Sequence, residues 1–101
     1  MTVPHPRWSL TLYVSGAAPR SAAALETVRR LCDEELAGQV ELQVVDVTDE
    51  PALAERDGIV AVPTLVKRLP APPRRLVGDL ADLGRVRAGI DLPPPPVPGA
   101  P

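Results

Sequence analysis

The 101-residue chain is poor in the residues that carry most protein chemistry: it has one cysteine, one histidine, one methionine and no phenylalanine. A single cysteine, Cys32, excludes an intramolecular disulfide and any metal site built from several cysteines. Trp8 and Tyr13 are the only aromatic residues. The sequence therefore predicts a domain whose core is assembled almost entirely from Leu, Val, Ile and Ala.

Long apolar segments and a strong charge bias are also missing. No apolar stretch approaches the roughly 20 residues that a membrane-spanning helix needs, and MTVPHPRWSL lacks the apolar region of a signal peptide. Eleven Lys and Arg against 13 Asp and Glu leave a net charge of −2, which favours neither nucleic acid nor membrane as a partner. No phosphate loop or metal-ligand spacing occurs, so we expect no cofactor and no metal. These absences indicate a small cytoplasmic globular protein.

Proline, by contrast, is abundant, and six of its 14 residues fall in the last nine positions of the given sequence. Residues 1–7 read as a flexible arm, and residues 93–101, PPPPVPGAP, as a disordered polyproline-II tail. The foldable domain then spans residues 8–92. An alternative role for the tail is that of a ligand for an SH3-like groove.

Hydrophobic periodicity divides the domain into seven elements. Apolar residues alternate in WSLTLYV, which predicts a strand, whereas Leu25, Val28, Cys32 and Leu36 recur at helical spacing after Pro19. The last helix is expected to begin at a capping Asp79. The expected strands are residues 8–14, 40–47, 63–69 and 74–80, and the expected helices are residues 19–36, 51–57 and 79–92.

The resulting order, β-α-β-α-β-β-α, is that of an α/β thioredoxin-like fold. The first crossover predicts a parallel strand pair, and the short PAPP connection predicts an antiparallel hairpin. In this fold a cis-proline precedes the third strand, which explains why Pro63 interrupts the apolar run GIVAVPTLVKR. We therefore predict a cis bond before Pro63.

The position where thioredoxins carry their reactive Cys-x-x-Cys is occupied by SGAAPRS, which contains no cysteine. Cys32 lies about three turns into the helix, on its apolar stripe, and is expected to be a structural residue. His5 is flanked by prolines and is not expected to act as a base. The sequence thus predicts no catalytic residue and disfavours a thioredoxin-like oxidoreductase or peroxidase. It favours a protein that works by binding another protein.

Several separated segments resemble the KaiB family in order and spacing: LYVSG, VVDV, IVAVPTL and LPAPPRRLVGDL. The resemblance covers residues 8–92 and implies a circadian or timing role, with the N-terminal ring of a KaiC-type ATPase as partner. It also implies a second, resting fold that shares only the N-terminal β-α-β segment up to Val47, often in a dimer or tetramer. Gly89 and Asp91 match family positions that shift the balance between the two folds.

We predict the partner-binding surface around the hairpin, at Lys67, Arg68, Arg74 and Arg75, with the second helix beside it. Of these, Lys67 and Arg74 coincide with basic positions that resemble family partner contacts. Charges that merely protect an exposed strand are the alternative explanation. A KaiB-like sensor or adaptor domain, related to those of clock histidine kinases, is the alternative function, and such a kinase is a second expected partner. The proline-rich end, Ala23 and Gly58 depart from the family pattern, which leaves a full oscillator and a simpler timing or stress role open.

Overall fold

The computed structural model describes residues 5–16 and 18–93. Its elements follow the predicted order and are β1 (Trp8–Val14), α1 (Pro19–Glu35), β2 (Val40–Asp46), α2 (Pro51–Arg56), β3 (Thr64–Leu69), β4 (Arg74–Val77) and α3 (Leu83–Gly89). The strands form one sheet in the order β2-β1-β3-β4. The predicted parallel pair β1–β2 and the predicted antiparallel hairpin β3–β4 are both present. The thioredoxin-like fold is confirmed.

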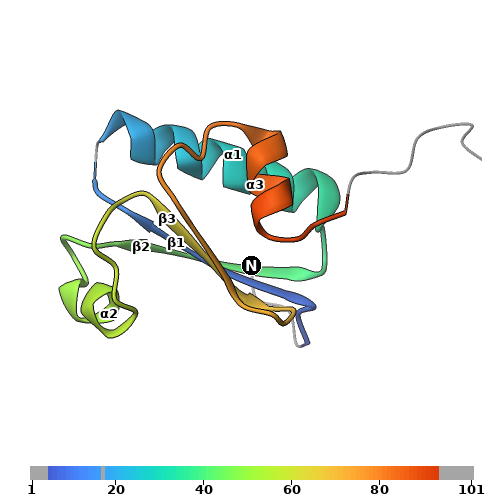
Figure 1. Cartoon of the computed structure of the whole chain (residues 1–101), viewed down its shortest axis with the longest axis horizontal. Helices are drawn as coiled ribbons and strands as arrows, with labels where there is room; N and C mark the ends of the chain where they lie inside the picture. Colours follow the sequence, from blue (N-terminus) through green and yellow to red (C-terminus); the bar gives the residue numbers. More distant parts are fainter. Residues whose placement is uncertain (1–4, 17, 94–101) are drawn as a thin grey trace, which may run out of the picture.

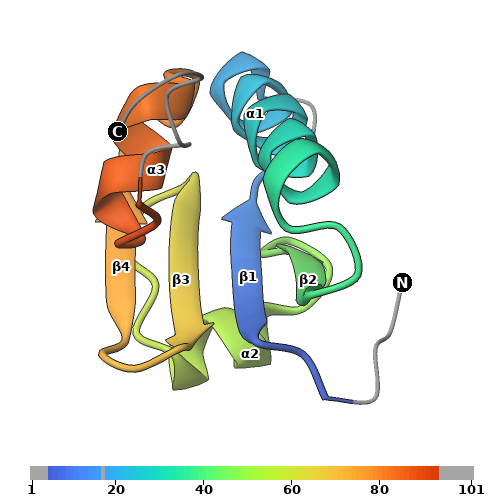
Figure 2. The same ribbon diagram turned by 90° about the vertical axis from the view of Figure 1, so that its right-hand side faces the viewer.

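Helices cover both faces of the sheet, as Figures 1 and 2 show. α1 and α3 lie side by side on one face, and the short α2 lies on the other, at one end of the sheet. The alternation of β1 creates both contacts: Leu10, Leu12 and Val14 belong to the core under α1 and α3, whereas Tyr13 packs with Val45 on the α2 side. β1 is accordingly buried on both faces from Leu10 to Val14.

The sequence of α1 explains its length and direction. Pro19 occupies the first turn, where a missing N–H costs nothing, and the apolar stripe, including Val28 and Cys32, is buried. Gly38 then turns the chain back toward β2 with φ of 76°, a left-handed conformation that suits glycine.

The start of α3 differs from the prediction. The helix begins at Leu83, and its capping residue is Asp82, whose side chain accepts a hydrogen bond from the Arg85 N–H. Asp79, the expected cap, instead accepts from the Ala81 N–H in the preceding loop. The predicted arm and tail fall mostly outside the described residues.

Pro63 lies where the fold requires it. The Val62–Pro63 bond is cis, as predicted, and β3 begins at the next residue. The Pro63 carbonyl accepts a hydrogen bond from the Gly78 N–H, 3.3 Å away, which joins the end of β4 to the start of β3. The proline therefore ends a loop and does not interrupt the sheet.

Candidate functional site

The β3–β4 hairpin carries the four basic residues that the sequence singled out, but it does not place them on one surface. Lys67 pairs with Arg74 across the two strands, and Val66 pairs with Arg75. Because successive side chains of a strand point to opposite faces, Lys67 and Arg74 lie on the face covered by α3, and Arg68 and Arg75 on the face of α2. Each pair contacts one aspartate: Lys67 and Arg74 contact the aspartate that follows α3, and Arg68 and Arg75 contact the aspartate that follows α2.

On the α3 side this residue is Asp91, two positions after the helix. Its Oδ2 accepts from Arg74 Nε at 2.7 Å and lies 3.4 Å from Lys67 Nζ. The hydrogen bond from Arg74, and to a smaller extent that from Lys67, hold the pKa of Asp91 below its usual value. Asp91 has φ of 61°, the only positive φ among the described residues other than glycine.

Lys67 is not the surface residue that the sequence analysis expected. Its side chain is 1% exposed, and its Nζ lies 5.7 Å from the centre of the Trp8 ring, in reach of a cation–π interaction. The reason is that β3 is an internal strand between β1 and β4. In this conformation the Lys67 side chain is shielded from solvent, whereas the Arg74 side chain, 51% exposed, faces solvent directly.

On the α2 side, Asp57 gathers donors from three elements. Its Oδ2 accepts from Arg68 Nη2 at 2.5 Å and from the Tyr13 hydroxyl. Arg75 Nη2 donates to the Asp57 backbone carbonyl at 2.7 Å, and Arg68 Nε donates to Thr11 Oγ1 at 3.1 Å. This cluster, which we call the Asp57 cluster, ties the end of α2 to β1, β3 and β4.

The protonation of the Asp57 cluster follows from its contacts. The hydrogen bond from Arg68, and then that from Tyr13, lower the pKa of Asp57. The pKa of Tyr13 is raised, mainly because the ring is buried and next because its hydroxyl donates to Asp57. The sequence analysis did not select Tyr13 or Asp57 as site residues. The place of Tyr13 in the alternating pattern of β1, on the face opposite to Leu12, was a signal that could have pointed to it.

Gly89 and Asp91, the predicted fold-switch residues, both lie where α3 meets β4. A Cβ atom on Gly89 would overlap the side chain of Leu76 in β4. Glycine therefore permits the close packing of the last turn of α3 against the hairpin, while Asp91 fixes the chain immediately after it.

The chain between β1 and α1 contains no cysteine, and a serine that follows β1 is joined to one in the first turn of α1. Ser21 Oγ accepts from the Ser15 N–H at 3.0 Å. Cys32 is buried on α1, and burial, followed by the charge of Asp33, raises the pKa of its thiol to about 11.

The residues described by the structure include no group of three or more His, Cys, Asp or Glu side chains that could hold a metal ion. Within residues 5–16 and 18–93, no helix is long and apolar enough to cross a membrane.

Comparison with solved structures agrees with the fold. A thioredoxin from Malassezia sympodialis superposes with a TM-score of 0.70 at 20% identity, covering 86% of this chain and 77% of its own. The N-terminal domain of SasA from Synechococcus elongatus gives a TM-score of 0.66 at 28% identity, covering 96% of this chain and 94% of its own.

Comparison of sequences goes further. The KaiB domain model matches residues 11–92. A protein named circadian clock oscillator protein KaiB, from Synechococcus sp. strain RCC307, is 48% identical over 89 residues, which is 88% of this chain and 81% of that protein. Its namesake from Microcystis aeruginosa strain NIES-843 is 46% identical over 92 residues, covering 91% and 88% of the two chains. The chain belongs to the KaiB family.

Proposed function

We propose that this protein is a non-catalytic clock or timing regulator that binds the N-terminal ring of a KaiC-type ATPase. Support comes from membership of a family whose relatives are named as clock oscillator proteins. Further support is the absence of a cysteine between β1 and α1, where a thioredoxin would carry its nucleophile. The observation that carries the proposal is the β3–β4 hairpin at one edge of the sheet, whose exposed Arg68 and Arg74 are held by Asp57 and Asp91.

We assign the contact to the β4 edge of the sheet, where a partner can meet Arg74 on one face and Arg68 and Arg75 on the other, with Lys67 acting from inside the fold. The side chains of Arg68 and Arg74 are 42% and 51% exposed. Their guanidinium groups are held in place by Asp57 and Asp91, so less side-chain entropy is lost when a partner binds. Charge complementarity at such a surface increases the association rate more than it sets the affinity.

Size-exclusion chromatography of the protein with a KaiC-type ATPase from the same genome, in ATP and in ADP, tests the proposal. We expect nucleotide-dependent co-elution after an incubation long enough for a slow conformational change. Arg74→Ala should weaken the complex, whereas Arg30→Ala, which removes an exposed pair with Glu34 on α1, should not. No complex in either nucleotide would refute the ATPase as partner.

The family membership also leads us to propose that the chain exchanges with a second, resting fold, and that Gly89 and Asp91 influence the balance. Two packings of one sequence coexist only when they differ by a few kcal/mol. Small changes at the α3–β4 junction can then alter the populations. Two sets of amide NMR signals, with intensities that change in Gly89→Ala or Asp91→Asn, are the expected result. A single set, identical in the variants, would contradict this part of the proposal.

A second candidate function is that of a sensor or adaptor domain like those of clock histidine kinases. The specific observation in its favour is the likeness to the SasA N-terminal domain over 96% of this chain. If this function holds, the chain should bind the ATPase without a slow phase, because no change of fold would precede binding.

A further inference from the structure

A pocket of about 290 Å³ lies where α2 meets the sheet, on the face opposite to α1 and α3. Its apolar part is formed by Val45 of β2 and Leu53 of α2, which belong to the same small core. Its polar part comes from three elements: Gln43 from β2, Arg56 from α2 and Arg68 from β3. Sites for small molecules combine an apolar lining with a few polar groups that converge on the ligand. The pocket has this composition.

Both arginines of the pocket have hydrogen-bond donors to spare. Arg68 gives its Nε–H to Thr11 and one Nη2 hydrogen to Asp57, which leaves both hydrogens of its Nη1 without a partner among the described residues. Arg56 is exposed and forms no ion pair within residues 5–16 and 18–93. Guanidinium groups bind the oxygens of carboxylates and phosphates in pairs. Two of them at one pocket therefore indicate an oxyanion as ligand.

The balance of charges selects the kind of oxyanion. Arg56 and the Asp57 cluster together hold three guanidinium groups, those of Arg56, Arg68 and Arg75, against the one carboxylate of Asp57. The Asp57 carboxylate already accepts from Arg68 and Tyr13 through the same oxygen. A phosphate group carries a charge of about −1.5 to −2 at pH 7, which matches the excess of two positive charges. A carboxylate would leave one of them unmatched.

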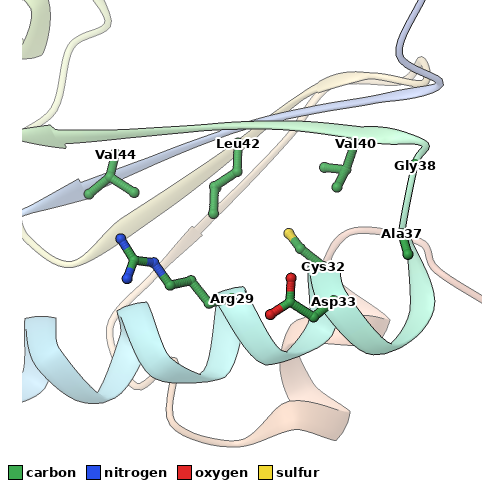
Figure 3. Close-up of a pocket in the computed structure, with 8 residues that line it drawn as sticks. All are labelled: Arg29, Cys32, Asp33, Ala37, Gly38, Val40, Leu42 and Val44. Carbon is green, nitrogen blue, oxygen red and sulfur yellow. The ribbon is translucent and has the colours of Figure 1, made fainter. Parts of the chain in front are cut away.

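The larger groove between α1 and β2, with a volume of about 350 Å³, does not share this chemistry. Figure 3 shows one positive side chain, Arg29, and one negative side chain, Asp33, on the helix, with valine and leucine side chains of β2 opposite them. Because the two charges cancel, this groove gives an anion no advantage. The pocket beside α2 differs from it in having an excess of positive charge and several free N–H donors.

We propose that the pocket beside α2 binds a phosphate group, held by Arg56, Arg68 and the amide of Gln43. A small organic group attached to the phosphate can lie against Val45 and Leu53. The bound phosphate then joins α2 to β2 and β3, so it stabilises the folded domain by mass action. This site does not depend on the ATPase as partner.

Titration of the ¹⁵N-labelled full chain with sodium phosphate at pH 7, at an ionic strength held constant with sodium chloride, tests the site. We expect saturable amide shifts at Gln43, Leu53 and Arg56, none in α3, and a dissociation constant of about 1 mM. Arg56→Gln should raise this constant about tenfold. Arg85→Gln is the matched control, because it removes one exposed positive charge from α3 on the opposite face, and it should leave the constant unchanged. Shifts that do not saturate, or an equal loss in both variants, would overturn the proposal.

Two further measurements separate phosphate from anions in general. Sodium acetate should bind about tenfold more weakly than phosphate, and equal affinities would refute phosphate as the ligand class. Phosphate should also raise the thermal unfolding midpoint of the wild type and of Arg85→Gln more than that of Arg56→Gln. An equal rise in all three proteins would show a general salt effect and would refute the site. Each measurement uses the chain alone, so its result is independent of ATPase binding.

Discussion

Lys67 offers a direct test of how the basic hairpin is built, because its side chain is buried although it ends in an ammonium group. Lys67→Ala keeps Cβ and removes the other three carbons of the four-carbon stem from the interior. At about 0.8 kcal/mol per buried methylene, the loss is about 2.5 kcal/mol of unfolding free energy. Lys67→Met keeps most of this volume and removes the charge. Asp91 is 43% exposed and remains paired with Arg74, so Lys67→Met leaves no unpaired charge buried, and we expect a change within about 1 kcal/mol.

Urea unfolding followed by far-UV circular dichroism measures both variants, with the slope of the transition as a check that the unfolded states are comparable. A domain of this size has a total stability of about 5–15 kcal/mol, so the two outcomes are well separated. If Lys67→Met proves as destabilising as Lys67→Ala, the ion pair with Asp91 outweighs the burial of the stem, and the reasoning is wrong. Lys67→Met should also retain the ATPase complex; loss of binding with unchanged stability would make Lys67 a direct contact.

Three further predictions follow from the titratable groups. Tyr13 is the single tyrosine, so its ultraviolet absorbance titration should show a midpoint above 10 in the folded protein and about 10 in denaturant. The raised pKa of Tyr13 contributes stability below about pH 10 that is lost as the pH rises through the folded value. A midpoint of about 10 in both states would contradict the buried hydrogen bond to Asp57. Cys32 should react with a disulfide reagent at pH 8 far more slowly in the native state than in urea, since its pKa is about 11; equal rates would show that the thiol is accessible. The lowered pKa of Asp57 contributes stability that is complete above about pH 5 and is lost as the pH falls below about 4. The stability difference between the wild type and Asp57→Asn should therefore shrink in that range. A difference independent of pH would disprove the pairing with Arg68.

The fold was largely predictable because its signals are local. The alternation in β1, the stripe of α1 and the proline before β3 each depend on neighbours in the sequence, and β1 and the cis bond were predicted to the residue. The start of α3 was misplaced because Asp79 and Asp82 are the same good capping residue, and the sequence does not show that Leu80 is buried from a loop before the helix begins.

The candidate site was predictable in composition but not in arrangement. The separation of Lys67 from Arg68 onto two faces follows from strand alternation and could have been foreseen. The burial of Lys67 could not, because it depends on Trp8 and Asp91, which are distant in the sequence and meet only in the folded sheet. Tyr13 and Asp57, 44 residues apart, escaped prediction for the same reason.

The two aspartates that hold the hairpin arginines also determine what kind of surface the hairpin can recognise. An arginine side chain has five N–H donors, and Arg74 gives only its Nε–H to Asp91, while Arg68 uses Nε for Thr11 and Nη2 for Asp57. A partner carboxylate can therefore bind the remaining donors while the aspartate stays in place, but it then lies beside that aspartate and is repelled by its charge. A partner that presents acidic and basic groups side by side meets both the arginine and the aspartate, whereas a uniformly acidic surface meets only the arginine. As the contact surface that we propose, the hairpin should therefore prefer a partner surface of mixed charge.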